Sequence, residues 1–316
     1  MKKYIKALIC AMLVAVLVAV GSGCAKVSYV TGSAMQAVED VKSGEWKTKN
    51  IKEQSTEDKV LIEELTPGTY GGVEFNNLDD VMNYYKAAYD KTKAKTAPYI
   101  DENGTTQEWY AFAGSQEIIV SDILIDGQSN AVINKLIPQL LDSLYKPSIA
   151  GLQPSMNQDP KLDVDENNES LLTLRATAED LVAGNVKDNG DGTITIEIQP
   201  KLAEMSHVGL DSQGKVFTSL NDIGSVYDAV DAFTWASGTT DENVKVTYKD
   251  GTAQITIDTA SGEIVAANYN MRAYAQVQHA NLAVVHDKSA TVTVDYIVKF
   301  PADEAFYDKV NVHPAG

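Results

Sequence analysis

The sequence predicts an α+β fold, in which one or more long, curved antiparallel β-sheets pack against amphipathic helices. Three observations carry this prediction. Residues 263–278 and 289–300 read as strands of unusual length, and the second alternates apolar and polar side chains. A run rich in Asp and Gly at 188–192 is typical of a hairpin turn. Residues 78–93 and 130–145 carry apolar side chains at helical spacing.

The first predicted elements are a strand and a helix. Residues 60–65 favour a strand, and the Pro and Gly residues of 67–72 indicate a turn after it. Asn77 is a suitable N-cap for a helix over residues 78–93, because its side chain can accept a hydrogen bond from the first helical turn.

Two strands and a second helix follow. Residues 107–112 and 117–125 read as strands, and the second of them is strongly apolar. Residues 130–145 favour a helix whose apolar face is broad enough to be buried on more than one side. Pro138 should kink this helix or mark its true start, because proline lacks the N–H that a helix interior needs.

Residues 155–170 form the predicted acidic linker between two modules, since the segment 151–168 is rich in Pro, Asp, Asn and Gln and lacks apolar periodicity. An α+β module is expected over residues 46–154 and a β-rich α+β module over residues 171–310. Residues 163–169 place oxygen ligands at every second position, as calcium loops do. The glycine and the distal acid of such loops are missing, so a solvated acidic linker is expected instead.

The second module contains the remaining predicted elements. One hairpin turns at 188–192, a helix covers residues 220–233, and a second hairpin joins 244–248 to 253–258 around another Asp-Gly pair. The two long strands complete the module. If they pair with each other, His279 and His286 lie near the tip of their hairpin.

Charge and cysteine content exclude several functions. The formal charge is −18, and without the lysines of residues 1–23 there remain 23 basic against 44 acidic residues, or −21. Nucleic acid is therefore not an expected partner, because binding its backbone needs a basic surface. The only cysteines are Cys10 and Cys24. Neither lies in the body of the protein, which therefore offers no disulfide, zinc knuckle or thiol nucleophile.

The first residues read as a secretion signal. Residues 1–6 are basic, and residues 7–20 are an apolar run that is shorter than the roughly twenty residues of a membrane span. Small residues and a cysteine follow in the order Gly21, Ser22, Gly23, Cys24. This arrangement resembles the lipobox of bacterial lipoproteins, in which the cysteine receives a diacylglyceryl lipid and becomes the new N-terminus.

The resemblance implies a signal peptide over 1–23, a lipid on Cys24, a tether over 24–45 and an extracytoplasmic body at the cell membrane. Two acyl chains anchor a protein stably, because each buried methylene contributes about 0.8 kcal/mol. Lipoproteins usually carry Leu or a similar residue where this chain has Gly21. Cleavage by ordinary signal peptidase and retention of the leader as an anchor therefore stay open as alternatives.

No local motif predicts catalysis, a metal or a cofactor. The chain has no G-x-S-x-G elbow, H-E-x-x-H, P-loop or dinucleotide-binding fingerprint. Its histidines have no recurring carboxylate or cysteine partner in the sequence, and they are His207, His279, His286 and His313. The aromatic residues of the first module could stack on sugars, but their spacing favours a core, and they are Tyr84, Tyr85, Tyr89, Tyr99, Trp109, Tyr110 and Phe112.

The second half resembles exported proteins of unassigned function from Gram-positive bacteria, on its K-D-N-G-D-G-T-I-T-I hairpin, the run Gly214 to Phe217 and the paired long strands. A curved sheet wrapped against helices also resembles lipid-carrier folds. The first resemblance implies no activity and supports only a secreted α+β body. The second implies a non-enzymatic binding module that holds an apolar or lipid ligand. The alternatives are a surface adhesion or structural protein that contacts protein or glycan of the cell envelope, and an extracytoplasmic hydrolase.

Overall fold

The structure of the protein is a computed structural model. It describes residues 26–29, 57–93, 95–100, 103–110, 114–121, 123–129, 149–150, 152–154, 174–206, 210–217, 223–231, 233–282, 285–302, 304–310 and 313–314. All helices, strands and contacts below lie within these ranges.

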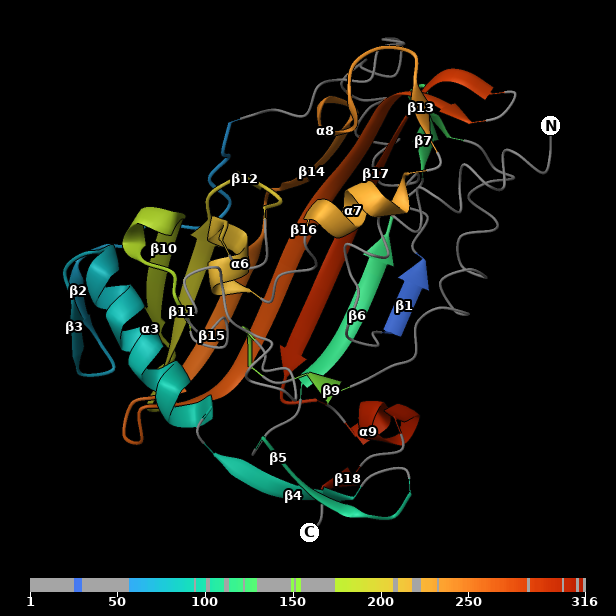
Figure 1. Cartoon of the computed structure of the whole chain (residues 1–316). Helices are drawn as coiled ribbons and strands as arrows, with labels where there is room; N and C mark the ends of the chain where they lie inside the picture. Colours follow the sequence, from blue (N-terminus) through green and yellow to red (C-terminus); the bar gives the residue numbers. More distant parts are fainter. Residues whose placement is uncertain are drawn as a thin grey trace.

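A long and strongly curved sheet dominates the molecule (Figure 1). Within the described residues it contains 13 strands, and its main path has the order β1-β6-β17-β16-β15-β11-β10. These strands are β1 (Lys26–Tyr29), β6 (Gly114–Val120), β10 (Leu181–Asp188), β11 (Thr193–Pro200), β15 (Thr252–Asp258), β16 (Glu263–Leu282) and β17 (Val285–Phe300). All neighbours on this path are antiparallel except β1 and β6, which are parallel. The fold is therefore rich in antiparallel β-structure, as the sequence predicts.

Shorter strands extend the sheet, and two small sheets stand beside it. The additional strands are β7 (Leu124–Ile125), β8 (Gln128–Ser129), β9 (Ile149–Ala150), β12 (Ala203–Glu204), β13 (Thr234–Trp235) and β14 (Val244–Tyr248). The small sheets consist of β2 (Gly68–Tyr70) with β3 (Val73–Phe75), and of β18 (His313–Pro314), β4 (Thr96–Ile100) and β5 (Thr106–Tyr110). The helices are α3 (Leu78–Lys93), α6 (Ser212–Val216), α7 (Ile223–Ala229), α8 (Thr240–Asn243), α9 (Glu304–Val310) and the 3₁₀ turn η2 (Ala178–Asp180).

Helix α3 confirms the predicted helix over residues 78–93 and its cap. The Asp80 N–H donates to the Asn77 side chain at 3.0 Å, which satisfies one free N–H of the first turn. The buried side chains of α3 form one face, which packs on β10 and β16, and they are Val81, Met82, Tyr85, Ala88, Tyr89 and Thr92. Its apolar stripe therefore covers the sheet.

The two longest strands pair as the predicted hairpin. β16 and β17 run antiparallel from Ala267 opposite Phe300 to Leu282 opposite Val285. Along β17 the alternation is as expected, because Val292, Val294 and Tyr296 are buried while the residues between them face away from the core. The first Asp-Gly hairpin is also confirmed, since β10 and β11 pair across residues 189–192.

The core lies between the sheet and the helices α3, α6 and α7, which cover one of its faces (Figure 1). Tyr85 on α3 and Tyr269 on β16 are both fully buried, and their hydroxyl oxygens lie 3.3 Å apart. The ring of Tyr269 also meets that of Phe217 edge to face, at 6.1 Å between centroids. This favourable geometry links α3, α6 and the sheet in one aromatic cluster.

The buried tyrosines predict a loss of stability at high pH. Burial raises the pKa of Tyr269 to about 12 and the pKa of Tyr85 well above its ordinary value of 10.0. Both phenols are neutral in the folded protein at a pH where they ionise in the unfolded chain. Their contribution is thus fully present below pH about 10 and is lost as the pH rises toward about 12. Urea denaturation followed by circular dichroism should show this decline, and a midpoint that stays constant over this window would contradict it.

The second predicted hairpin is wrong. β14 and β15 do not pair with each other, because both run antiparallel to β16, with Tyr248 opposite Ala273 and Thr252 opposite Asn270. The residues between them, 249–251, face only two residues of β16 and form a β-bulge in one continuous line of strand. Asp250 has a φ of 60°, which accommodates the extra residue. The Asp-Gly pair therefore marks a bulge at this place and a turn at 188–192.

The strand expected over residues 60–65 is also wrong, since this segment is not part of any sheet. The turn expected over residues 67–72 is confirmed in outline, because residues 71–72 connect β2 to β3. The helix expected over residues 220–233 is represented by the shorter α7, after which Val230 and Phe233 still enter the core. Strands β5, β6 and β7 correspond to those expected over 107–112 and 117–125.

Several expectations lie outside the described residues. These are the leader over 1–23, Cys24, the helix over 130–145 and the linker over 155–170 with its oxygen ligands. The main sheet takes β6 from the expected first module and its longest strands from the second. The range 24–45, expected as a tether, includes β1, whose first residue follows Cys24 by two positions.

Candidate functional site

The face of the sheet that turns away from α3 is polar, and we call it the polar face. Strand pairing aligns a row of polar residues across it, consisting of Asn185, Glu197, Gln254, Asn268 and Lys299 on β10, β11, β15, β16 and β17. Side chains that lie opposite one another on neighbouring strands interact directly. The row therefore presents hydrogen-bonding groups from five strands on a continuous surface.

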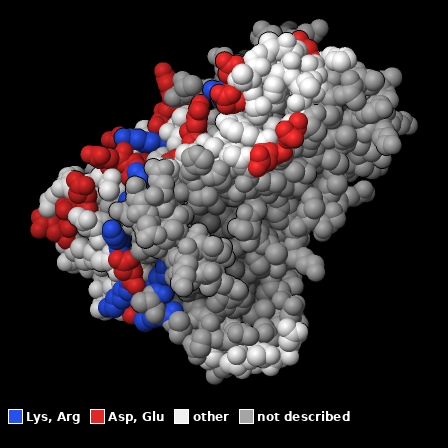
Figure 2. All heavy atoms as spheres, viewed as in Figure 1, with Lys and Arg blue, Asp and Glu red and all other residues white. Residues whose placement is uncertain are grey.

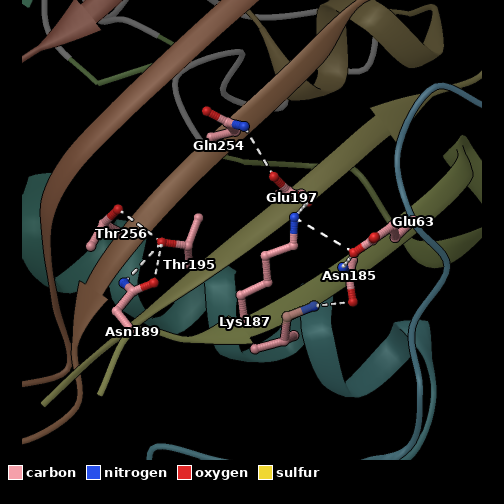
Figure 3. A network of polar contacts seen from close by, with 9 residues as sticks. Glu63, Asn185, Lys187, Asn189, Thr195, Glu197, Gln254 and Thr256 are labelled. Atoms are coloured by element: carbon pink, nitrogen blue, oxygen red, sulfur yellow. Dashed lines mark hydrogen bonds and ion pairs between the residues drawn. The ribbon is translucent and has the colours of Figure 1, made fainter. Parts of the chain in front are cut away.

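Glu197 is the centre of this row. Its side chain is only 9% exposed. Its carboxylate accepts a hydrogen bond from Gln254 Nε2 at 3.0 Å and forms an ion pair with Lys187 Nζ at 2.9 Å. Lys187 also lies 3.6 Å from the exposed Glu63. Figure 3 shows Lys187 between the two glutamates, with Asn185 directed toward Glu63. The hydrogen bond to Glu197 raises the pKa of Lys187, so this amine is charged in the folded protein.

A segment that we call the strap, residues 58–63, crosses the polar face at β11. Gln199 is 1% exposed and binds the strap backbone twice, because its Oε1 accepts from Leu61 N at 2.8 Å and its Nε2 donates to Lys59 O at 2.7 Å. Leu202 N donates to Asp58 Oδ1 at 2.7 Å. Side chains of the sheet thus hold the strap in place of a strand ladder, which explains why the apolar run of 60–65 forms no strand.

A groove of about 490 Å³ lies between the strap and the polar face. This volume falls in the range of small-molecule sites. The strap contributes Leu61, Ile62 and Glu63 to its lining, and the sheet and bulge contribute Lys187, Glu197, Asp250, Thr252, Gln254, Asn270 and Arg272. The lining is mainly polar, so the groove is suited to a ligand with many hydrogen-bonding groups.

The far wall of the groove contains an ion pair and a carboxylate–phenol contact. Arg272 binds Asp295 through two hydrogen bonds, from Nε at 2.6 Å and from Nη2 at 3.0 Å, and this contact raises the pKa of the guanidinium. The Tyr274 hydroxyl donates to Asp250 Oδ2 at 3.1 Å. Burial, together with the charge of Asp250, raises the pKa of Tyr274 to about 12. Tyr274 is therefore a neutral donor that fixes Asp250 at the bulge.

A second pocket lies inside the core, beside α7. Its lining is apolar and includes Ile123, Val226, Val246, Val277 and Val292. The volume is about 20 Å³, which accommodates about one water molecule. A lipid chain does not fit in a space of this size.

The hairpin of β16 and β17 carries His279 and His286 near its tip, as expected. His279 Nδ1 lies 2.8 Å from Asp287 Oδ1, and His286 is exposed. The described part of the chain contains no group of three or more His, Cys, Asp or Glu side chains that could hold a metal ion. Asp188, in the turn between β10 and β11, accepts hydrogen bonds from the backbone N–H groups of Gly190 and Gly71, at 2.8 Å and 2.9 Å.

Three of the aromatic residues considered for ligand stacking belong to the core. Tyr85, Tyr89 and Tyr99 are buried. Tyr84 is partly buried and packs edge to face on Phe75. Phe112 and the side chains of Trp109 and Tyr110 lie outside the described structure. The expectation of a core is therefore confirmed for the buried three.

Sequence reasoning missed every residue of the groove. A signal was present, because Thr193, Thr195, Glu197 and Gln199 alternate with buried isoleucines along β11. Alternation of this kind identifies a face but is equally typical of a face that only meets water. The alignment of polar residues across five strands, which distinguishes a site, depends on pairings between residues far apart in the chain.

The outer surface agrees with the acidic composition. Figure 2 shows acidic side chains over the left and upper described parts of the helix-covered side, with basic side chains mainly at the lower left. None of the helices among the described residues is long and apolar enough to cross a membrane. Comparison with known proteins adds no relative, since no family model, no curated protein and no solved structure matches this chain.

Proposed function

We propose that this protein is a lipid-anchored, extracytoplasmic binding protein that holds a hydroxyl-rich ligand, such as a glycan of the cell envelope, in the groove beside the strap. The observation that carries the proposal is the polar row on five strands, bordered by a groove of about 490 Å³. Amide, carboxylate and guanidinium groups on rigid strands are suited to sugar hydroxyls, because they offer donors and acceptors in fixed directions.

The groove supports a polar ligand better than the apolar ligand expected from the sequence. The described apolar pocket has room for about one water molecule. The groove is large enough for a small polar ligand, and its lining offers hydrogen-bonding groups. An apolar ligand would need space formed by other residues. We therefore place the glycan alternative first and retain the lipid ligand as the competing proposal.

One experiment separates these ligands. The purified full chain is applied to an array of oligosaccharides, and a parallel sample is examined by native mass spectrometry and solvent extraction. We expect binding to a subset of the glycans and no bound lipid beyond the covalent anchor. Extraction of a stoichiometric free lipid, together with no glycan binding, would overturn the proposal in favour of an apolar ligand.

The proposed anchor rests on the leader and on Cys24. Since β1 begins two residues after Cys24, a lipid at this cysteine would lie within about 7 Å of chain from the sheet. The body would then sit directly at the membrane surface. Phosphate-rich surfaces do not attract a chain of this acidity, so the covalent lipid would have to supply the attachment.

Replacing Cys24 with serine tests the anchor. We expect the wild-type chain in the membrane fraction, with the mass of a diacylglyceryl adduct on a chain that begins at residue 24. The C24S variant should lose the adduct and, when its leader is cleaved elsewhere, appear in the soluble extracytoplasmic fraction. Recovery of the wild-type chain with residues 1–23 intact and no adduct would refute the anchor while leaving the groove proposal unaffected.

Hydrolysis of a bound glycan is the second candidate, because Glu63, Glu197 and Asp250 share the groove. Glycosidases use two carboxylates, one of which donates a proton. Both oxygens of Glu197 already accept from Lys187 and Gln254, which suits a structural role better than proton donation. Incubation with any glycan that binds, followed by mass analysis of the glycan, decides the matter. Shortened products that the E197Q variant fails to make would favour the hydrolase.

A further inference from the structure

The charges of the groove restrict its ligand further than its polarity does. Its cationic groups are already matched by protein carboxylates, since Arg272 binds Asp295 through two hydrogen bonds and Lys187 binds Glu197 at 2.9 Å. An anionic ligand would have to displace these carboxylates. Such a replacement gains little, because each cation already has a partner with good geometry.

The carboxylates of the groove exceed its cations. The charged residues of its lining are Glu63, Glu197 and Asp250 against Lys187 and Arg272, and Arg272 is already paired with Asp295 outside the lining. The lining therefore carries one negative charge in excess, and a groove with low-dielectric walls concentrates the field of such an excess. The remaining charge of the protein has the same sign. A positively charged group is therefore attracted and an anionic one repelled.

Asp250 is the carboxylate with the fewest partners. Its Oδ2 accepts from Tyr274, but its Oδ1 is shielded from water and has no hydrogen-bond partner among the described residues. The same holds for Asn270 Oδ1 in the lining beside it. Both unmatched atoms are acceptors. The bulge fixes the position of Asp250, because the strands on either side of it, β14 and β15, both pair with β16. Asp250 itself has a φ of 60°.

From this imbalance we infer that the ligand of the groove carries a positively charged amine next to its hydroxyls, as a glycan of amino sugars does, and that the amine is attracted by Asp250. The inference rests on the proposed glycan-binding function and specifies its ligand class. An amine supplies a positive charge and hydrogen-bond donors, which match the excess carboxylate charge and the two unmatched acceptors. It can also approach Asp250 while the neighbouring cations keep their carboxylate partners.

The test compares two probes that differ only in this group. The full chain is titrated calorimetrically with a glucosamine oligomer and with an N-acetylglucosamine oligomer of equal length, at a pH where the free amine is protonated. We expect the glucosamine oligomer to bind at least about tenfold more tightly, which corresponds to about 1.4 kcal/mol. The preference should shrink as salt is added, because exposed charges are screened.

The D250N variant assigns the effect to one side chain. Asparagine has the same shape and tolerates a positive φ, so the bulge should persist. We expect D250N to reduce the preference for the amine, measured as the ratio of the two dissociation constants, at least about fivefold, so that any effect common to both oligomers cancels. D287N is the matched control, because Asp287 also has a positive φ of 49° and lies exposed at the hairpin tip. Thermal melts of both variants establish that they are folded.

The outcomes separate the inference from the function on which it depends. Equal affinity for the two oligomers, or tighter binding of the acetylated one, would overturn the inference and leave glycan binding intact. A preference for the amine that D250N retains would overturn the role of Asp250. Binding of neither oligomer, nor of any other glycan on the array, would overturn both the proposed function and the inference.

Discussion

Replacing Tyr269 with alanine is expected to lower the free energy of unfolding by about 3–5 kcal/mol, the usual cost of removing a buried aromatic ring. Tyr269 is 1% exposed and lies in β16, the strand that pairs with β13, β14, β15 and β17. Its ring packs against Phe217 and its hydroxyl lies beside that of Tyr85. The cavity left by Y269A would therefore open at the junction of α3, α6 and the sheet.

Two further variants divide this loss into its parts. Y269F keeps the ring and removes the contacts of the hydroxyl with Tyr85 and with the backbone of Gln153, so it should cost about 1–3 kcal/mol. V265A, on the same strand, should change stability by less than about 0.5 kcal/mol, because Val265 is 45% exposed. Urea denaturation measures all three. A loss below about 1 kcal/mol for Y269A would mean that the aromatic cluster is not packed as described.

Replacing Gln199 with leucine should release the strap and impair ligand binding. Leucine keeps most of the volume but removes both hydrogen bonds to the backbone of Lys59 and Leu61. The loss of two such partly buried bonds is expected to cost about 1–3 kcal/mol locally, since each contributes about 0.5–1.5 kcal/mol. The strap forms one wall of the groove, so affinity for the glycan probes should fall by about tenfold or more.

Amide hydrogen exchange measures the release directly. In Q199L, exchange at Leu61 should accelerate, while exchange in β16 and β17 should stay slow. Q276L is the matched control on the same face, since Gln276 Nε2 is buried without a hydrogen-bond partner in the described structure. Its replacement should leave both the strap and the binding unchanged. Slow exchange at Leu61 in Q199L, with normal affinity, would show that other contacts hold the strap.

Local pattern predicted those elements whose signals lie within a few residues. The cap at Asn77 and the apolar spacing after it located α3 to the residue. The long strands and the turn at 188–192 were found in the same way. These are places where capping, periodicity and turn chemistry agree with one another.

Sequence patterns gave wrong predictions where contacts with residues far away in the sequence determine the structure. An Asp-Gly pair permits a hairpin at 249–252, but β16 is long enough to pair with the strands on both sides of it, so the same residues form a bulge. The apolar run at 60–65 is held by the side chain of Gln199, which is remote in sequence. The groove depends on the same long-range pairings. For this reason its residues could be assigned to a face from the sequence but not to a site.

The bulge at 249–251 also determines which side chains of β14 and β15 face the core. The buried residues of β14 have even numbers and those of β15 have odd numbers, namely Val244, Val246 and Tyr248 before the bulge and Ala253, Ile255 and Ile257 after it. The additional residue causes this change from even to odd numbers, and the bulge absorbs it, so that both sets stay on the same side of the sheet. Straightening the bulge with all three residues retained would turn the isoleucines toward solvent and Gln254 inward. Selection at this place should therefore tolerate exchanges of residue type, or the deletion of one residue, more readily than a further insertion.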